Sequence, residues 1–280
     1  MNPKYIRLLL ILAMVGLSVF LALGNPIFKE SLLYVLGWMT FLWLVSLALK
    51  DSSIIDIFWG FSFVLMSVYY FRESGNYESF DYIFLFMCIL WGSRLTFYLG
   101  IRNMGKPEDF RYQQFRKEGG INYWWISFFR VFLLQGILVW ILSSIFFVAY
   151  ESAVESLKWI HILGIVVWII GIFFETAGDA QLKKFKSNPE NKGKVLNTGL
   201  WALTRHPNYF GDAMVWWGFY LFGFAISHSI VFIAMPMLMT FLLRRVSGVA
   251  MLENTLKKTK PGFEEYCKKT PAFYPFIGKK

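Results

Sequence analysis

The sequence predicts an all-α integral membrane protein, a helical bundle with about eight transmembrane helices. Of its 280 residues, 56% are hydrophobic and 20% are aromatic, which is more apolar surface than a soluble core of this size can bury. The apolar residues gather in eight runs near the length of about 20 residues that a helix needs to cross a bilayer. Lys and Arg recur in every second segment between the runs, as expected when alternate loops face the cytoplasm.

We expect the eight spans near residues 8–23, 32–49, 54–71, 82–99, 124–150, 159–176, 209–226 and 230–243. The first run is not a cleavable signal, because no small-residue cleavage site follows it and further spans come after it. The last two runs are short and joined by Ser227, His228 and Ser229, which indicates a helical hairpin. Cys88 lies inside a span and Cys267 in a basic tail, so no disulfide is expected.

The charged residues between the runs predict the topology. The segments at 102–117, 183–205 and 244–280 are basic, whereas the segments that hold Glu78 and Glu155 are acidic or nearly neutral. Basic loops stay on the cytoplasmic side, so we expect both termini in the cytoplasm and the protein in the cytoplasmic membrane of a bacterium. The net charge of +10 mostly reflects this topology. It also produces a face able to hold an anion, and a nucleic-acid partner is not needed to explain it.

The stretch from 199 to 218, GLWALTRHPNYFGDAMVWWG, concentrates polar residues at the mouth of a predicted span. Within eight residues it contains Arg205, His206, Asn208, Tyr209 and Asp212. The proline between them suits the first turn of a helix, so residues 208–220 should be helical. The free amides of that turn, with the two preceding bases, favour an anionic ligand. Anchoring to lipid headgroups is the alternative, but anchoring does not require so many different polar types.

A second polar series ends the sixth predicted span. Glu175 and Asp179 are four residues apart on one helical face, which Lys183 and Lys186 continue beyond the bilayer. Simple surface ion pairs are one interpretation of this spacing. Glu175 is too deep for a surface position, so a polar ligand or an arginine partner is the better interpretation.

The early spans contain a smaller set of polar candidates. Asp56 lies one turn inside the third span, where it marks either a site or a helix cap. Arg94, within the fourth span, is its candidate ion-pair partner. The segment 102–125 mixes charges with aromatic residues, which is typical of an amphipathic segment on the membrane surface. Its residues 111–113 could equally roof a pocket. The basic and aromatic tail around Glu253 has the same two interpretations, surface binding or closure over a cofactor.

These motifs resemble the steroid 5α-reductase C-terminal superfamily, most closely its bacterial branch, over roughly residues 51–276. The resemblance rests on E-x-x-x-D-x-x-x-K-x-x-K from Glu175 to Lys186, on G-L-W-x-L-T-R-H-P-N-Y-F-G-D from Gly199, and on L-E-x-x-x-x-K-x-x-x-G-F-E-E-Y from Leu252. Sterol reductases and isoprenylcysteine carboxyl methyltransferases carry a similar R-H-P-x-Y-x-G, which holds NADPH in the former and S-adenosylmethionine in the latter. The central motif is therefore specific to a superfamily but not to one reaction.

The resemblance implies an NADPH site, with lysines near phosphate and Asn and Asp near ribose or nicotinamide. The implied ligands are Asp179, Lys183, Lys186, Asn208, Tyr209 and Asp212. The steroid reductases polarise an enone carbonyl with a Gln-Glu pair and a Tyr on their early spans. The matching segments of this chain contain Asp56 and, beside Arg94, Trp91. The residues expected to contact the substrate therefore differ from those of the steroid reductases.

We interpret the protein as a membrane reductase that transfers hydride from NADPH to an activated C=C bond of a lipophilic, steroid-like or isoprenoid substrate taken from the bilayer. Residues 1–150 would form the substrate half and residues 151–280 the cofactor half. Predicted catalytic residues are Asp56 and Arg94, and predicted cofactor-binding residues are Glu175, Asp179, Lys183, Lys186, Arg205, His206, Asn208, Tyr209 and Asp212. We expect membrane lipids as further partners and no metal.

A lipid methyltransferase dependent on S-adenosylmethionine is the first alternative. A lipid transporter is the second, disfavoured because the polar residues cluster at one face and no inverted repeat is visible.

Overall fold

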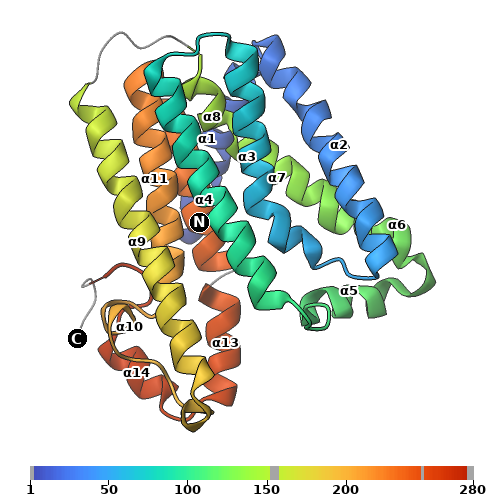
Figure 1. The fold of residues 1–280 in the computed structure, drawn as a ribbon, viewed down its shortest axis with the longest axis vertical. Coiled ribbons are helices and arrows are strands. Elements are labelled where there is room, and N and C mark those ends of the chain that lie inside the picture. Colours follow the sequence, from blue (N-terminus) through green and yellow to red (C-terminus); the bar gives the residue numbers. More distant parts are fainter. Residues whose placement is uncertain (1–2, 152–157, 247–248, 276–280) are drawn as a thin grey trace. The chain divides into compact units, whose positions relative to one another are not determined.

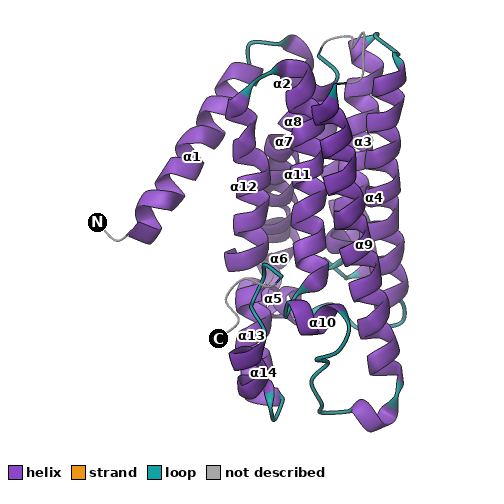
Figure 2. Cartoon of the chain, turned by 90° about the vertical axis from the view of Figure 1, so that its left-hand side faces the viewer, coloured by secondary structure: helices purple, strands orange, loops and turns teal. Residues whose placement is uncertain are grey.

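Helices make up all the regular structure in the part of the chain that the computed structural model describes, namely residues 3–151, 158–246 and 249–275 (Figure 2). The prediction of an all-α protein is confirmed within these residues. Glu155, which supported the topology prediction, lies outside them.

Each of the eight apolar runs coincides with a helical segment. The first half of the described chain contains α1 (Pro3–Ala22), α2 (Pro26–Leu49), α3 (Ile54–Ser74), α4 (Ser79–Asn103), α5 (Phe110–Gly119), α6 (Tyr123–Ser127), α7 (Leu134–Leu142) and α8 (Ser144–Ala149). The second half contains α9 (Trp159–Ser187), α10 (Leu200–Leu203), α11 (Pro207–Ser227), α12 (Ala234–Phe241), α13 (Val249–Thr259) and α14 (Phe263–Lys269).

Within the described residues, five helical stretches are long and apolar enough to cross a membrane. They are α2, α3, α4, the stretch Phe110–Ala149 and α9. The protein is therefore a multi-pass membrane protein.

Contacts along the chain divide it into two compact units. The N-terminal unit consists of Leu12–Ser156 with Ile226–Phe232. The C-terminal unit consists of Leu157–Ala225 and Ile233–Lys280, together with Met1–Ile11. Each unit contains one pair of helices in very close contact.

In the N-terminal unit the close pair is α3 and α4 (Figure 1). A Cβ added to Gly60 would lie 2.8 Å from the carbonyl oxygen of Gly92, and one added to Gly92 would lie 2.6 Å from that of Gly60. Glycine lets two backbones approach to this distance, as is common between membrane helices. Buried aromatic rings, among them Phe63 and Trp91, fill the space beside the contact.

In the C-terminal unit the close pair is α9 and α11, which run side by side (Figure 1). Their glycines recur every seven residues, at Gly164, Gly171 and Gly178 on α9 and at Gly211 and Gly218 on α11. Seven residues are close to two helical turns, so each series faces one way. A Cβ added to Gly171 or to Gly218 would lie 2.6 Å from an atom of the facing helix. This contact carries the predicted polar residues of both helices into one place.

Candidate functional site

The start of α11 meets the polar end of α9. The helix begins at Pro207, as predicted from the missing amide proton of proline. Gly178 makes room for this junction, because a Cβ there would lie 3.2 Å from the amide nitrogen of Asn208. The side-chain amide of Asn208 donates a hydrogen bond of 3.1 Å to the carboxylate of Asp179. Two residues predicted to bind the cofactor are thereby brought together.

Four of the predicted polar residues in this unit are buried. Glu175 is 3% exposed, Asp179 4%, His206 1% and Asp212 8%. Buried acids on apolar helices are rare and usually mark a functional site. Lys183, one turn beyond Asp179, is exposed.

Arg205 holds the C-terminal tail against the central motif. Its Nε and Nη2 donate to the two carboxylate oxygens of Glu253, at 2.8 and 3.2 Å. Its Nη1 donates to the carbonyl oxygens of Cys267 and Thr270, and its backbone amide to that of Pro271. The tail therefore folds back onto the motif, and the guanidinium makes most of its hydrogen bonds within the protein.

His206 contacts the same carboxylate. Its Nε2 is 3.1 Å from Oε1 of Glu253, and its ring stacks on Tyr209 with the centroids 5.7 Å apart. Burial lowers the pKa of His206, although Glu253 opposes the shift. The ring is therefore neutral at pH 7 and donates from Nε2 to the carboxylate. Its Nδ1 is then a buried acceptor that has no hydrogen-bond partner within the described residues.

Glu253 is the residue whose importance the sequence least revealed. Burial by itself would raise its pKa, but hydrogen bonds from His206 and Arg205, with the positive charge of Arg205, lower it to about 2. The carboxylate is thus ionised at neutral pH. The sequence signals for it were the acidic residue in the L-E-x-x-x-x-K motif and the interpretation that the tail around it closes over a cofactor.

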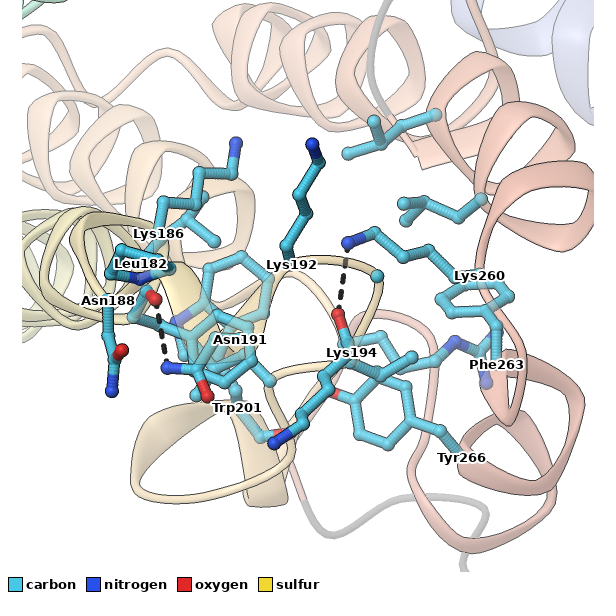
Figure 3. Close-up of a pocket in the computed structure, with 18 residues that line it drawn as sticks. Leu182, Lys186, Asn188, Asn191, Lys192, Lys194, Trp201, Lys260, Phe263 and Tyr266 are labelled. Carbon is cyan, nitrogen blue, oxygen red and sulfur yellow. Dashed lines mark hydrogen bonds between the residues drawn. The ribbon is translucent and has the colours of Figure 1, made fainter.

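A pocket of about 500 Å³ opens where α9 ends, next to α13 and α14 (Figure 3). Two of the predicted cofactor residues, Lys186 and Arg205, line it. Three lysines that the sequence analysis did not single out also line it, Lys192, Lys194 and Lys260. The other predicted cofactor residues are not part of its wall, so the predicted set divides between the buried helix junction and this pocket.

The N-terminal unit contains a separate polar cluster around Asp56. Its carboxylate accepts from Nη2 of Arg111 at 2.6 Å and from the hydroxyl of Tyr112 at 2.7 Å. Gln135 donates to the same hydroxyl at 3.3 Å. Both carboxylate oxygens of Asp56 thus bind residues of α5, which were not its candidate partners. The Arg94 guanidinium lies 5.2 Å from the centre of the Tyr98 ring.

Asp56 does not cap its helix either. Ser53 occupies the N-cap position of α3, and Asp56 stands in the first turn. The segment 102–125 forms part of this cluster, since α5 within it supplies both partners of Asp56. Arg111 and Tyr112 were considered only as residues that could roof a pocket. Asp56 and Arg111 are 55 residues apart in the sequence, so no local pattern indicated that they pair.

Comparison with known proteins places this architecture in a family. Residues 42–270 match the family model described as "Protein of unknown function (DUF1295)". An uncharacterized protein of Schizosaccharomyces pombe is 27% identical over 237 residues, which cover 74% of this chain and 67% of that protein. The probable O-methyltransferase ustE of Ustilaginoidea virens is 30% identical over 112 residues, 40% of this chain and 34% of that protein. No solved structure matches the chain. Because the family model covers most of its length, the chain belongs to the DUF1295 family.

Proposed function

We propose that this protein is a membrane-embedded, NADPH-dependent reductase of an activated C=C bond in a lipophilic substrate, steroid-like or isoprenoid. The observation that carries the proposal is the burial of Glu175, Asp179, His206 and Asp212 at one glycine-packed junction of two apolar helices. Buried acids within apolar helices usually mark a functional site, and binding of a polar ligand is the function that this site supports best. The resemblance to the steroid 5α-reductase superfamily supplies the identity of that ligand.

The groups at the junction fit a nucleotide cofactor. Asp179 and Asn208 offer carboxylate and amide groups of the kind that bind ribose hydroxyls and carboxamides. The Nδ1 of His206 is a buried acceptor with no hydrogen-bond partner in the described part of the chain. Lys183, exposed one turn further along α9, would meet phosphate. When bound, NADPH supplies the hydride.

One of the predicted cofactor residues, Arg205, has a different role in this proposal. Arg205 makes its hydrogen bonds to Glu253 and to tail carbonyls. We therefore assign it the positioning of the central motif and of His206, through their shared carboxylate, rather than a direct bond to phosphate.

The substrate half would use the cluster around Asp56. There Asp56 binds the guanidinium of Arg111, whose further N–H groups would donate a hydrogen bond to a substrate carbonyl. Arg94 stays a predicted catalytic residue.

We also propose eight spans with both termini in the cytoplasm of a bacterial cell, from the alternation of basic segments. Single cysteines placed at 106 and 192 should be labelled from the cytoplasmic side, and one at 78 from the outer side. Labelling of positions 106 and 192 from opposite sides would contradict the eight-span topology.

A methyltransferase dependent on S-adenosylmethionine is the second candidate, because ustE, a relative over part of the chain, is named a probable O-methyltransferase. The central R-H-P-x-Y-x-G motif suits both reactions. The two candidates differ in the charge of the cofactor, since NADPH is a polyanion and S-adenosylmethionine carries a sulfonium and an amine.

Thermal unfolding of the detergent-solubilised protein with NADPH, NADH and S-adenosylmethionine separates the candidates. A ligand at 100 times its Kd stabilises the folded state by about 2.7 kcal/mol, and we expect NADPH to give the largest shift. Asp179→Ala and Asn208→Ala should weaken this effect, each by about 1 to 3 kcal/mol. The exposed Lys184→Ala on the same helix is the matched control. A shift with S-adenosylmethionine alone would favour the methyltransferase, and unchanged NADPH binding in both variants would refute the proposed site.

A further inference from the structure

The pocket at the end of α9 combines an apolar wall with a positively charged rim. Its wall includes the indole of Trp201 and the rings of Phe185, Phe263 and Tyr266, with leucine side chains from α9 and α13. Tyr266 donates a hydrogen bond to the backbone carbonyl of Trp201, and the indole of Trp201 donates to the carbonyl of Gly178 at 3.1 Å, so each ring is held by its own hydrogen bond. Hydrogen bonds therefore hold the aromatic residues of the apolar wall in place.

The rim is cationic. The pocket is lined by four lysines, Lys186, Lys192, Lys194 and Lys260, and among the described residues by no aspartate or glutamate. In Figure 3 the side chains of Lys186 and Lys192 extend to the same side of the pocket. Lys260 donates to the carbonyl of Lys194 at 3.1 Å, which joins α13 to the segment that follows α9. An anion bound between Lys192, Lys194 and Lys260 would reduce the repulsion among their like charges.

Lysines on a cytoplasmic face are expected from topology alone. Topology does not require them to surround a hollow with an aromatic and aliphatic wall. The combination of that wall with a lysine rim matches a ligand with an apolar body and an anionic head, because long apolar groups need burial and phosphate needs charge-assisted hydrogen bonds.

We infer that this pocket binds a lipid phosphate, with the phosphate among Lys192, Lys194 and Lys260 and the hydrocarbon chain against Trp201 and Phe263. No carboxylate of the described residues lines the pocket, which argues against a ribose, because carboxylates commonly accept hydrogen bonds from ribose hydroxyls. The positive charge of the rim argues against a sulfonium. Its volume of about 500 Å³ lies within the range of small-molecule sites. The inference does not depend on the proposed reductase activity.

Binding of farnesyl phosphate to the purified full-length protein in a neutral detergent tests the inference. Farnesol has the same chain without the phosphate, and inorganic phosphate has the head without the chain. We expect farnesyl phosphate to bind at least tenfold more tightly than either. In K192E/K260E the affinity for farnesyl phosphate should fall at least tenfold. In K184E/K257E, which makes the same charge change at exposed lysines of α9 and α13 outside the pocket wall, it should not change.

The outcomes distinguish this inference from the proposed function. We expect K192E/K260E to keep the thermal shift with NADPH and D179A/N208A to keep the affinity for farnesyl phosphate. Equal binding of farnesol and farnesyl phosphate, or equal losses in the two lysine double variants, would overturn the lipid-phosphate site. Loss of NADPH binding in K192E/K260E, with no binding of farnesyl phosphate, would assign the pocket to the cofactor and also overturn it.

Discussion

The two units hold similar carboxylate clusters in different surroundings. In the C-terminal unit Glu253 is bound by Arg205 and by the ring of His206. In the N-terminal unit Asp56 is bound by Arg111 and by the hydroxyl of Tyr112. The exposed fractions of the acid and arginine side chains are 14% and 11% in the first cluster, against 26% and 31% in the second.

The difference in exposure indicates a structural role for the cluster of Arg205 and Glu253, and a role in contacting a ligand for the cluster of Arg111 and Asp56. The more enclosed guanidinium of Arg205 also binds two tail carbonyls, so it joins three segments of the C-terminal unit. The guanidinium of Arg111 binds only side chains of neighbouring acids, Asp56 and Asp109, among the hydrogen bonds of the described residues. A more open cluster with fewer backbone ties is better placed to exchange a protein partner for a ligand.

The largest effect should come from the close helix contact that positions the C-terminal polar residues. In Gly211→Leu the new side chain would meet the backbone nitrogen of Glu175 and lie 2.6 Å from the Gly171 carbonyl oxygen. We expect a loss of about 3 kcal/mol or more in stability, since two backbones would have to separate. Gly37→Leu, where nothing lies within 4 Å of the added Cβ, should be neutral. Thermal unfolding followed by circular dichroism measures both, and equal melting temperatures would contradict the close contact.

Removing the two acids compares the clusters directly. Glu253→Ala leaves Arg205 enclosed without its carboxylate, so we expect a loss of about 3 kcal/mol. Asp56→Ala leaves the more exposed Arg111 still paired with Asp109, and we expect a loss of about 1 to 2 kcal/mol. The measurement is the melting temperature of both variants in one detergent. A larger loss of stability in Asp56→Ala than in Glu253→Ala would show that the N-terminal cluster has the structural role.

The C-terminal cluster should also make the protein sensitive to acid. The pKa of His206 lies below its usual 6.5, so the unfolded chain binds this proton first and stability starts to fall below about pH 6.5. The pKa of Glu253 is lowered from 4.5 to about 2, so its stabilisation is complete above pH 4.5 and declines toward pH 2. In Glu253→Gln the decline below pH 4.5 should become shallower in a melting series from pH 7.5 to 3.5. An unchanged slope would show that the cluster does not control the acid response.

The smallest effect should come from one hydroxyl of the N-terminal cluster. Tyr112→Phe removes the hydrogen bond to Asp56 and the one from Gln135 while keeping the buried ring. We expect a loss of about 1 kcal/mol, because the arginine still binds the carboxylate. The matched change Tyr123→Phe removes a buried hydroxyl of the same unit that bonds to Ser52, outside the cluster. A much larger loss in Tyr112→Phe than in Tyr123→Phe would show that the hydroxyl supports the whole cluster.

Local patterns in the sequence determined the helices and the position of the polar junction. Apolar runs near bilayer length predicted the helical segments, because a helix in lipid makes its backbone hydrogen bonds within itself. Pro207 predicted the start of α11, and the four-residue spacing of Glu175 and Asp179 predicted that they share a face of α9. These inferences need only contacts between residues close in the chain.

Only the tertiary structure decided which charged groups meet. Arg205 binds Glu253, 48 residues later, and Asp56 binds Arg111, 55 residues later. Several arginines carry the same charge, so charge alone cannot select a partner. The selection depends on how closely the helices approach and on where the chain returns, as the glycines of α9 and α11 and the folded-back tail illustrate. The pocket with Lys192 and Lys260 depends on the same return of the tail, because its wall comes from segments about 70 residues apart.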